Sequence, residues 1–308
     1  MKLTGSFLKL VRWPNLVFIV LTQLLFYFCV FQPLYDFDNF RMLTWIIIAS
    51  VFIAAAGYII NDYFDLNIDQ VNKPEENVFV RKVNRRRAIL WHFLLSILGL
   101  MATAFAVGLS KWYLVLANFF VVILLWFYST SFKRQLLIGN IVISLLTAWT
   151  VLIIFFAFTN PSDALGATDD RPVKFFRVAF LYAGFAFIIS LVREAIKDMQ
   201  DLEGDARYGC RTLPIIAGIR TTKIYALVWL VVLLGSLIVL QLYVLLFKWW
   251  FAVGYSLFFI ILPLVYLIFR LYKAGNSSEF GRLSRLTKII MLTGIASMIF
   301  FRIYFNYG

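Results

Sequence analysis

Long apolar runs alternate with short polar connections along the whole chain. Each run has about 18–24 residues, the length that an α-helix needs to cross the hydrocarbon core of a bilayer. Nine runs are present, and we expect membrane-spanning helices over residues 14–31, 43–60, 88–109, 113–130, 136–158, 177–196, 222–243, 249–272 and 286–305. The connections are too short to hold a separate unit. The pattern therefore predicts an all-α membrane protein with a single domain over residues 1–308.

The composition supports a membrane protein. The chain has 308 residues, of which 62% are hydrophobic and 15% are charged. Soluble domains average about 45–50% apolar and about 25% charged residues. This difference excludes an ordinary soluble domain.

The basic residues report the orientation of the helices in the membrane. If the N-terminus is cytoplasmic, 22 of the 29 Lys and Arg residues lie on the cytoplasmic side of the nine predicted spans. This asymmetry follows the positive-inside rule. We therefore expect a multi-pass protein of a bacterial-type plasma membrane, with the N-terminus cytoplasmic and the C-terminus outside. The net charge of +13 is then a signal of topology, and no nucleic-acid partner is expected.

The acidic residues are concentrated in two short segments. Ten of the 16 lie in residues 61–76 and 194–205, which follow the second and sixth predicted spans on the same side of the membrane. Both segments carry aspartates at i, i+3 and i+7, and the two patterns are 136 residues apart. If each helix continues past the membrane, three such carboxylates share a face within an arc of about 60°. Like charges in this arrangement repel, so a bound cation is expected between them.

Two facing rows of carboxylates form a set of hard oxygen ligands that suits Mg²⁺, which is commonly completed by substrate phosphates. The predicted metal ligands are Asp62, Asp65, Asp69, Asp198, Asp201 and Asp205. Nearby cations would hold the same phosphates, and the predicted set is Lys73, Arg81, Lys133, Arg193 and Lys197. Mg²⁺ and cations together make a diphosphate a good leaving group, because they neutralise the charge that develops when the bond breaks.

These residues match a known family. The chain resembles the UbiA superfamily of intramembrane prenyltransferases over nearly its whole length. The N-D-x-x-D-x-x-x-D motif of that family is present as Asn61, Asp62, Asp65 and Asp69, and its D-x-x-x-D motif falls on Asp201 and Asp205. Residues 209–214 (Gly-Cys-Arg-Thr-Leu-Pro) and the pair Tyr128 and Lys133 resemble two further family elements. The loop after Lys73 departs from the family, because it lacks the usual glycine.

The resemblance implies a UbiA-like fold of nine helices around a central cavity, with acidic motif loops at residues 61–87 and 193–221. It implies Mg²⁺-dependent transfer of a prenyl group from an allylic diphosphate to a lipophilic acceptor. Asn61 and the aspartates would hold Mg²⁺ and the diphosphate, Tyr128 would steady the reacting carbon, and a second-motif aspartate would orient or deprotonate the acceptor. Asp62, Asp65, Asp201, Asp205 and Tyr128 are therefore the expected catalytic residues. No obligate protein partner is expected beyond membrane lipids.

The acceptor stays open at this point. Residues 193–205 look most like those of enzymes that act on geranylgeranylglyceryl phosphate, while the quinone precursors 4-hydroxybenzoate and dihydroxynaphthoate remain alternatives. A protein of another class, a cation transporter, could also use paired acidic segments. Such transporters place their ionisable residues near the middle of the bilayer, however, whereas these lie at the ends of predicted spans.

Overall fold

The computed structural model describes residues 7–72, 85–160 and 170–307. Within these residues, nine helices are long and apolar enough to cross a membrane, and no strand is formed. The prediction of an all-α protein with nine spans is confirmed. The chain is an integral, multi-pass membrane protein.

The helices follow one another with short connections. Their bounds are α2 Trp13–Phe26, η1 Tyr27–Phe31, α3 Gln32–Tyr35, α4 Phe40–Phe64, α5 Leu66–Asn72, α7 Arg85–Val107, α8 Trp112–Thr130, η2 Phe132–Arg134, α9 Ile138–Phe158, α11 Asp170–Gln200, α12 Leu202–Arg207, α13 Leu213–Leu245, α14 Trp250–Ser256, η3 Leu257–Ile261, α15 Leu262–Lys273, α16 Ser277–Ala296 and α17 Ile299–Tyr307.

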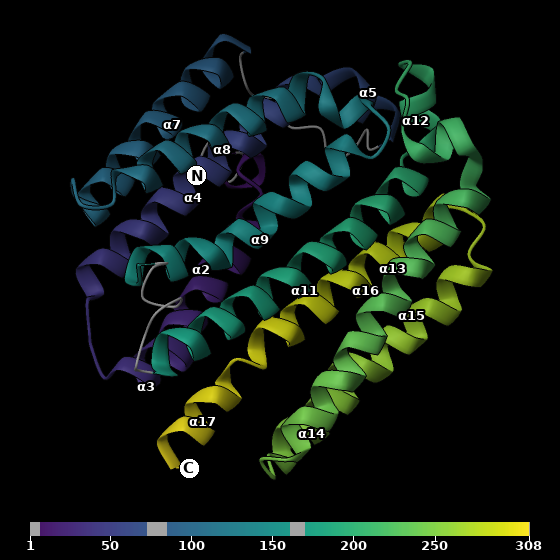
Figure 1. Ribbon diagram of the computed structural model, residues 1–308. Helices are drawn as coiled ribbons and strands as arrows, with labels where there is room; N and C mark the ends of the chain where they lie inside the picture. The colour runs from purple at the N-terminus through teal and green to yellow at the C-terminus, as the bar shows by residue number, and fades with distance from the viewer. Residues whose placement is uncertain (1–6, 73–84, 161–169, 308) are drawn as a thin grey trace.

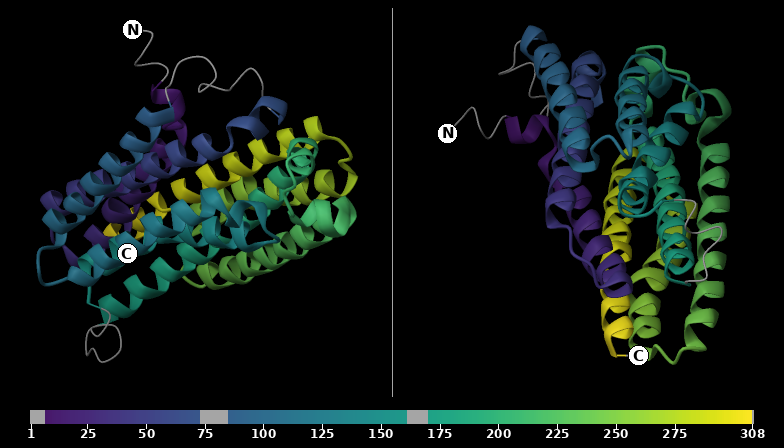
Figure 2. Two further views of the ribbon diagram at one scale, coloured as in Figure 1. Left: turned by 90° about the horizontal axis from the view of Figure 1, so that it is seen from above. Right: turned by 60° about the vertical axis from the view of Figure 1, so that its left-hand side comes forward.

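The bundle has three groups of helices. In Figure 1, α4, α7 and α8 form one side, α13 and α15 form the other, and α9, α11 and α16 lie between them. The short helices α5 and α12 lie at one end, and α17 lies at the opposite end (Figures 1 and 2). We call the end of the bundle at which α5 and α12 lie the α5–α12 end.

Helices α11 and α13 run further than the hydrophobic pattern predicts. Helix α11 has 31 residues, or about 46 Å at about 1.5 Å per residue, so it exceeds a hydrocarbon core of about 30 Å. It includes Asp198 and ends directly before Asp201, so it brings the second acidic motif to one end of the bundle. Helix α13 begins at Leu213, well before the predicted residue 222, but it is broken at Gly218 with φ 84° and ψ 160°. Only glycine adopts that conformation readily.

Two helices contain π-helical turns, each placed just before a proline. The turns η1 and η3 end two residues ahead of Pro33 and Pro263. Proline has no N–H and clashes with the carbonyl of the preceding turn, so a local widening of the helix accommodates it. The Phe259 carbonyl, four residues before Pro263, instead accepts a hydrogen bond from Thr293 Oγ1 at 2.9 Å. This bond joins α16 to the long helix that α14, η3 and α15 form together.

Aromatic packing holds the end opposite to α5 and α12. Phe175 of α11 packs against Phe26, Phe31 and Phe155, with ring centroids 5.3–5.5 Å apart. All four side chains are buried. Since lipid is as apolar as these rings, the stabilisation comes from close packing, at about 0.5–1.5 kcal/mol for each aromatic pair.

Candidate active site

Both acidic motifs contain a break in the helix at the same position. Helix α4 ends at Phe64 and α5 begins at Leu66, so Asp65 lies in the break. Helix α11 ends at Gln200 and α12 begins at Leu202, so Asp201 lies in the second break. The backbone angles of the two residues are nearly equal, at φ −85°, ψ −2° for Asp65 and φ −92°, ψ 8° for Asp201.

The expectation that each motif continues a straight helix is therefore wrong. Aspartate competes with the backbone for hydrogen bonds, so it is unfavourable inside a helix and favourable at helix ends. The break turns the third aspartate of each motif onto a short helix of its own. Only the first two aspartates of each motif, which precede and occupy the break, therefore share a helix face.

The breaks bring the two motifs together. Helices α5 and α12 pack against each other, although they are far apart in the sequence (Figure 1). A further bond joins the segment after α12 to the turn η2, because the backbone N–H of Arg211 donates to the carbonyl of Arg134 at 2.7 Å. The loop after α8, which carries Lys133, is thereby fixed beside both motifs.

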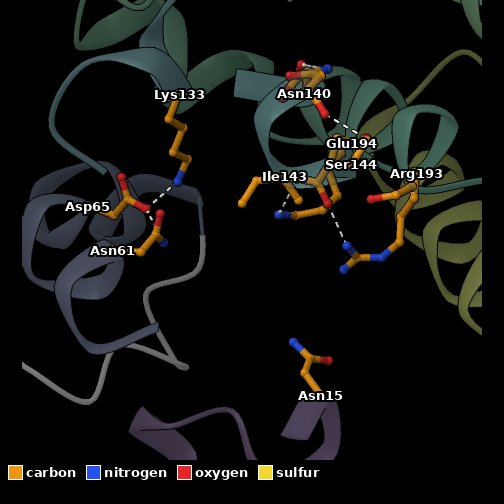
Figure 3. Close-up of polar contacts among 12 residues, drawn as sticks. Asn15, Asn61, Asp65, Lys133, Asn140, Ile143, Ser144, Arg193 and Glu194 are labelled. Atoms are coloured by element: carbon orange, nitrogen blue, oxygen red, sulfur yellow. Dashed lines mark hydrogen bonds and ion pairs between the residues drawn. The ribbon is translucent and has the colours of Figure 1, made fainter. Parts of the chain in front are cut away.

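Asp65 is the centre of the contacts made by the first motif. Its carboxylate is almost fully buried and accepts a hydrogen bond from Asn61 Nδ2 at 2.7 Å. The Lys133 ammonium forms an ion pair with the same carboxylate, as Figure 3 shows. Asp62 is paired with the guanidinium of Arg12 at 2.5 Å.

A glycine sets the position of Lys133. A Cβ atom at Gly139 would lie 2.8 Å from the carbonyl oxygen of Phe132 and 2.9 Å from Cα of Lys133. These are backbone atoms, which cannot move aside as a flexible side chain can. The absence of a side chain at Gly139 therefore lets the Lys133 turn pack directly on α9.

The second motif packs against α9 and against the short helix of the first motif. Asp198 Oδ2 accepts a hydrogen bond from Asn140 Nδ2 at 2.9 Å. Asp205 is buried, and burial is the main cause that raises its pKa to about 6, assisted by the negative charges of Asp201 and Asp65. The influence of Asp65 places carboxylates of both motifs within electrostatic range of one another.

A cavity of about 400 Å³ extends from this end of the bundle into its interior. Among the described residues, the charged side chains that line its polar part are five cations and one carboxylate, namely Arg12, Lys133, Arg193, Lys197, Lys288 and Glu194. Farther inside, the wall is mostly apolar and includes Ile53, Leu125, Leu146, Phe185, Leu237 and Phe300. Such a chamber suits an amphipathic ligand that has an anionic head and a long hydrocarbon tail.

The structure brings most of the predicted site residues to one place. Tyr128 is buried in the last turn of α8 and lines the cavity, next to Lys133. Arg193 and Lys197 line it from α11, and both contact Glu194, with Arg193 NH1 at 2.6 Å from Oε1 and Lys197 Nζ at 3.5 Å from Oε2. The predictions for Lys73, Arg81 and the side chain of Asp69 lie outside the described residues.

Sequence reasoning missed four polar residues of the site. In the sequence, Arg12 and Lys288 contribute only to the positive-inside asymmetry. No role is predicted for Asn15 or Asn140. Lys288 lies inside a predicted span, and an ionisable residue in such a position is by itself a sign of a functional site. The two asparagines give no comparable signal in the sequence, because their importance comes from what they contact.

The donor set at this site fits a hard cation. Asn61 Oδ1 is buried and has no hydrogen-bond partner among the described residues, so an oxygen is available beside the Asp65 carboxylate. Among the described side chains, no three acidic, His or Cys residues already converge as a metal-binding group. Two of the carboxylates are paired with Arg12 and Lys133, so a metal ion would compete with these cations for them.

Comparison with known proteins agrees with this geometry. A sequence model of the UbiA prenyltransferase family matches residues 16–289. The chain is 28% identical over 301 residues to the digeranylgeranylglyceryl phosphate synthase of Methanothermobacter thermautotrophicus, covering 95% of this chain and 94% of that protein.

Solved structures share the fold. A structure of digeranylgeranylglyceryl phosphate synthase superimposes with a TM-score of 0.62 at 22% identity, covering 97% of this chain and 99% of that one. A UbiA homologue from Archaeoglobus fulgidus, bound to DMAPP and Mg²⁺, superimposes with a TM-score of 0.61 at 18% identity, covering 95% and 99%.

Proposed function

The chain belongs to the UbiA prenyltransferase family, and from this membership we propose that it transfers a geranylgeranyl-type prenyl group to geranylgeranylglyceryl phosphate. The donor is an allylic diphosphate. A C–O bond forms between the acceptor hydroxyl and C1 of the prenyl chain, the bond from C1 to the diphosphate breaks, and diphosphate leaves. The hydroxyl proton passes to an aspartate of the second motif.

One observation carries this proposal. Helices α5 and α12 pack together, and the two contact partners of Asp65, Asn61 and Lys133, line a chamber that is cationic at one end and apolar beyond it. The cationic end suits the diphosphate, and the apolar part suits the isoprenoid tail. The carboxylates of both motifs lie at the end of the bundle and not near its middle, which does not suit the alternative of a cation transporter.

The acidic residues would hold the metal of the donor complex. Asn61, Asp62, Asp65 and Asp69 from the first motif, and Asp198, Asp201 and Asp205 from the second, are the proposed ligands. Bound Mg²⁺ neutralises negative charge on the diphosphate and so makes it a better leaving group. The digeranylgeranylglyceryl phosphate synthases among the relatives and the Mg²⁺ complex of the A. fulgidus homologue support this assignment.

The cationic side chains would bind and orient the phosphates. Lys133, held by Asp65 and by the Gly139 contact, is placed to contact the diphosphate. Lys73 and Arg81 are proposed for the same group, and Arg193 and Lys197 add positive charge on the α11 side. Tyr128 would lie against the reacting carbon, and the apolar wall would exclude water from the allylic cation.

The finer topology is also a proposal. The N-terminus is cytoplasmic, the C-terminus is outside, and the active site faces the cytoplasm. The distribution of Lys and Arg supports this orientation. The membrane is of the bacterial plasma-membrane type.

The test uses the purified full-length protein in detergent or liposomes. Labelled geranylgeranyl diphosphate is supplied with geranylgeranylglyceryl phosphate, 4-hydroxybenzoate or dihydroxynaphthoate, with Mg²⁺ or with EDTA. We expect Mg²⁺-dependent transfer to geranylgeranylglyceryl phosphate, reduced at least about 100-fold in Asp65→Asn and Asp201→Asn.

Glu203→Gln is the matched control, because Glu203 is exposed on α12 between two motif aspartates. It should retain nearly full activity. Transfer to a quinone precursor alone would replace the proposed acceptor. Full activity in Asp65→Asn or Asp201→Asn would refute the proposed site, and metal-dependent ion flux without transfer would favour the transporter.

A further inference from the structure

Positive charge in the cavity extends beyond the two cations that are paired with the first acidic motif. Lys133 and Arg12 are paired with Asp65 and Asp62 of the first motif. Lys288 of α16 and Arg193 of α11 line the same cavity, but among the described residues they form no ion pair with an aspartate of either motif. A chamber inside a membrane protein holds such excess charge at high cost unless an anion neutralises it.

Three helices contribute to this second group. Lys288 Nζ donates to Asn15 Oδ1 of α2 at 3.3 Å, which is a contact with a neutral amide. Arg193 NH1 contacts Glu194, while its Nε atom is buried and has no hydrogen-bond partner among the described residues. Glu194 also contacts Lys197, so this one carboxylate is shared by two cations. We call Asn15, Arg193 and Lys288 the Lys288 cluster.

The Lys288 cluster is separated from the group formed by Lys133 and the first motif. Figure 3 shows Arg193 and Asn15 on one side of the space and the group of Lys133, Asp65 and Asn61 on the other. Arg193, Lys197 and Arg12 lie within electrostatic range of Lys288 and repel it, which Glu194 offsets only in part. The buried Nε–H of Arg193 and the ammonium of Lys288 are donors that match phosphate oxygens.

We propose that the Lys288 cluster is a second anion site, which binds the phosphate monoester of the lipid acceptor. This inference rests on the proposed function: the allylic diphosphate is assigned to the aspartates, Lys133 and Lys197, and Arg193 is assigned here to the phosphate of the acceptor. A phosphate monoester carries close to two negative charges at neutral pH. Two cations from α11 and α16 would neutralise that charge and hold the acceptor so that its hydroxyl points towards the donor side.

The cluster then determines which acceptors are used. An acceptor without the phosphate would leave Lys288 and the buried Nε–H of Arg193 without an anionic partner and would bind weakly. Binding energy from this remote group would orient the reacting hydroxyl without taking part in the bond change. Lys288, Arg193 and Asn15 are in this sense positioning and specificity residues.

The first experiment compares two acceptors that differ only in the phosphate, geranylgeranylglyceryl phosphate and geranylgeranylglycerol. In Lys288→Met we expect KM for the phosphate acceptor to rise about 10- to 100-fold, the loss that follows removal of one charged hydrogen bond. KM for the alcohol acceptor and for geranylgeranyl diphosphate should stay within about twofold. Lys288→Arg should recover most of the loss.

A second variant changes charge with almost no change in shape. Asn15→Asp places a carboxylate opposite Lys288, so it should also raise KM for the phosphate acceptor and spare the alcohol. Arg285→Met is the matched control, since Arg285 is an exposed cation on the same helix and does not line the cavity. This variant should change neither the KM for the phosphate acceptor nor the KM for the alcohol acceptor.

Binding without turnover gives an independent readout. In EDTA and without donor, geranylgeranylglyceryl phosphate should bind to the wild-type protein and at least about 10-fold more weakly to Lys288→Met. Phosphatidic acid serves as a probe for general binding of lipid phosphate, and tighter binding of that lipid than of the acceptor would overturn the proposal.

Two kinetic outcomes would also overturn it. A rise in the KM for the diphosphate donor would assign Lys288 to the donor. Equal losses with the phosphate and alcohol acceptors would mean that Lys288 has no role in phosphate recognition. Absence of transfer to every acceptor would instead contradict the proposed function, and the EDTA binding measurement would still decide on the anion site.

Discussion

At the scale of single residues, two carboxylates of the site form ion pairs with neighbouring cations. Lys133 contacts the buried carboxylate of Asp65, and Arg12 contacts Asp62. Without such partners the carboxylates would repel one another in a partly buried setting. The same cations would therefore both stabilise the metal-free protein and compete with a metal ion.

Replacing Lys133 tests this competition. In Lys133→Met, kcat/KM for the diphosphate donor should fall about 10- to 100-fold, because one charged hydrogen bond to the donor is lost. The rise in Tm on adding Mg²⁺ should become larger than in the wild type, since the ion no longer displaces Lys133 from Asp65. Arg134→Met, one residue along the same turn, is the control. Reduced activity with an unchanged Mg²⁺ response would refute the competition between Lys133 and the metal.

The protonation of Asp205 predicts how metal binding depends on pH. Burial raises the pKa of this carboxyl to about 6 in the metal-free protein, so below that pH it is mostly protonated and cannot act as a ligand. The apparent Kd for Mg²⁺ should therefore increase as the pH falls through about 6.

Saturating Mg²⁺ should move the midpoint of the activity profile to lower pH, because the metal binds the deprotonated form. The measurement is Mg²⁺ affinity by thermal shift between about pH 5 and pH 8. Asp205→Asn should bind Mg²⁺ more weakly and should lose much of this pH dependence. If the midpoint of the wild-type activity profile against pH does not move with Mg²⁺ concentration, a role for Asp205 as a metal ligand is contradicted.

The sequence predicts the charged members of the site far better than the neutral ones. The spacing of Asp62 and Asp65, with an apolar run before them, identifies the first motif without any structure. Asn140 could not be identified in this way, because its value lies in a hydrogen bond to Asp198 across 58 positions of sequence. Lys288 carried a usable signal, an ionisable group in an apolar run, which was interpreted only as a sign of topology.

At the scale of elements, the matched breaks at Asp65 and Asp201 are the feature that the hydrophobic pattern could not give. The pattern reports where a helix is apolar, and both motifs are polar on either side of the break. Nearly equal backbone angles in the two breaks, four membrane spans apart, are consistent with an old internal duplication.

The turn that carries Lys133 packs closely on α9, so we expect Gly139→Ala to displace that turn. The new Cβ would lie within 3 Å of backbone atoms of Phe132 and Lys133, so the turn must shift. We expect kcat/KM for the donor to fall about 10-fold or more and the protein to lose about 1–3 kcal/mol of stability from overpacking.

Gly184→Ala is the matched control, because nothing lies within 4 Å of a Cβ at that position in α11. It should leave activity unchanged and should not reduce Tm. A Gly139→Ala variant with wild-type donor kinetics would mean that Lys133 is not positioned by this contact.

At the scale of the whole molecule, hydrophobic runs alone determined the number and approximate place of the spans. They did so because a membrane imposes a minimum helix length and excludes unpaired backbone groups. The pattern underestimated α11 and α13, whose ends leave the membrane and no longer need to be apolar. Helix-to-helix packing depends on shape, such as the fit of Gly99 against α4, and the pattern does not encode it.

The orientation of the molecule is a prediction of the same kind, and it can be tested by labelling. Ser110, in the connection between α7 and α8, and Ser278, near the start of α16, are both exposed and should lie on opposite sides of the membrane. Single cysteines at these positions are introduced into a chain in which the buried Cys29 and Cys210 are replaced by alanine. The two variants are otherwise identical, so each is the control for the other.

In intact cells, an impermeant maleimide should label Ser110→Cys and should label Ser278→Cys only after the membrane is permeabilised. The physical reason is the excess of Lys and Arg on the side of Ser278, which resists translocation across the membrane. Labelling of Ser278→Cys in intact cells would place α5, α12 and the Lys288 cluster on the outside. The charged donor and the phosphate acceptor would then have to reach the site from the outer face, so this one measurement also fixes the side on which both substrates must be supplied.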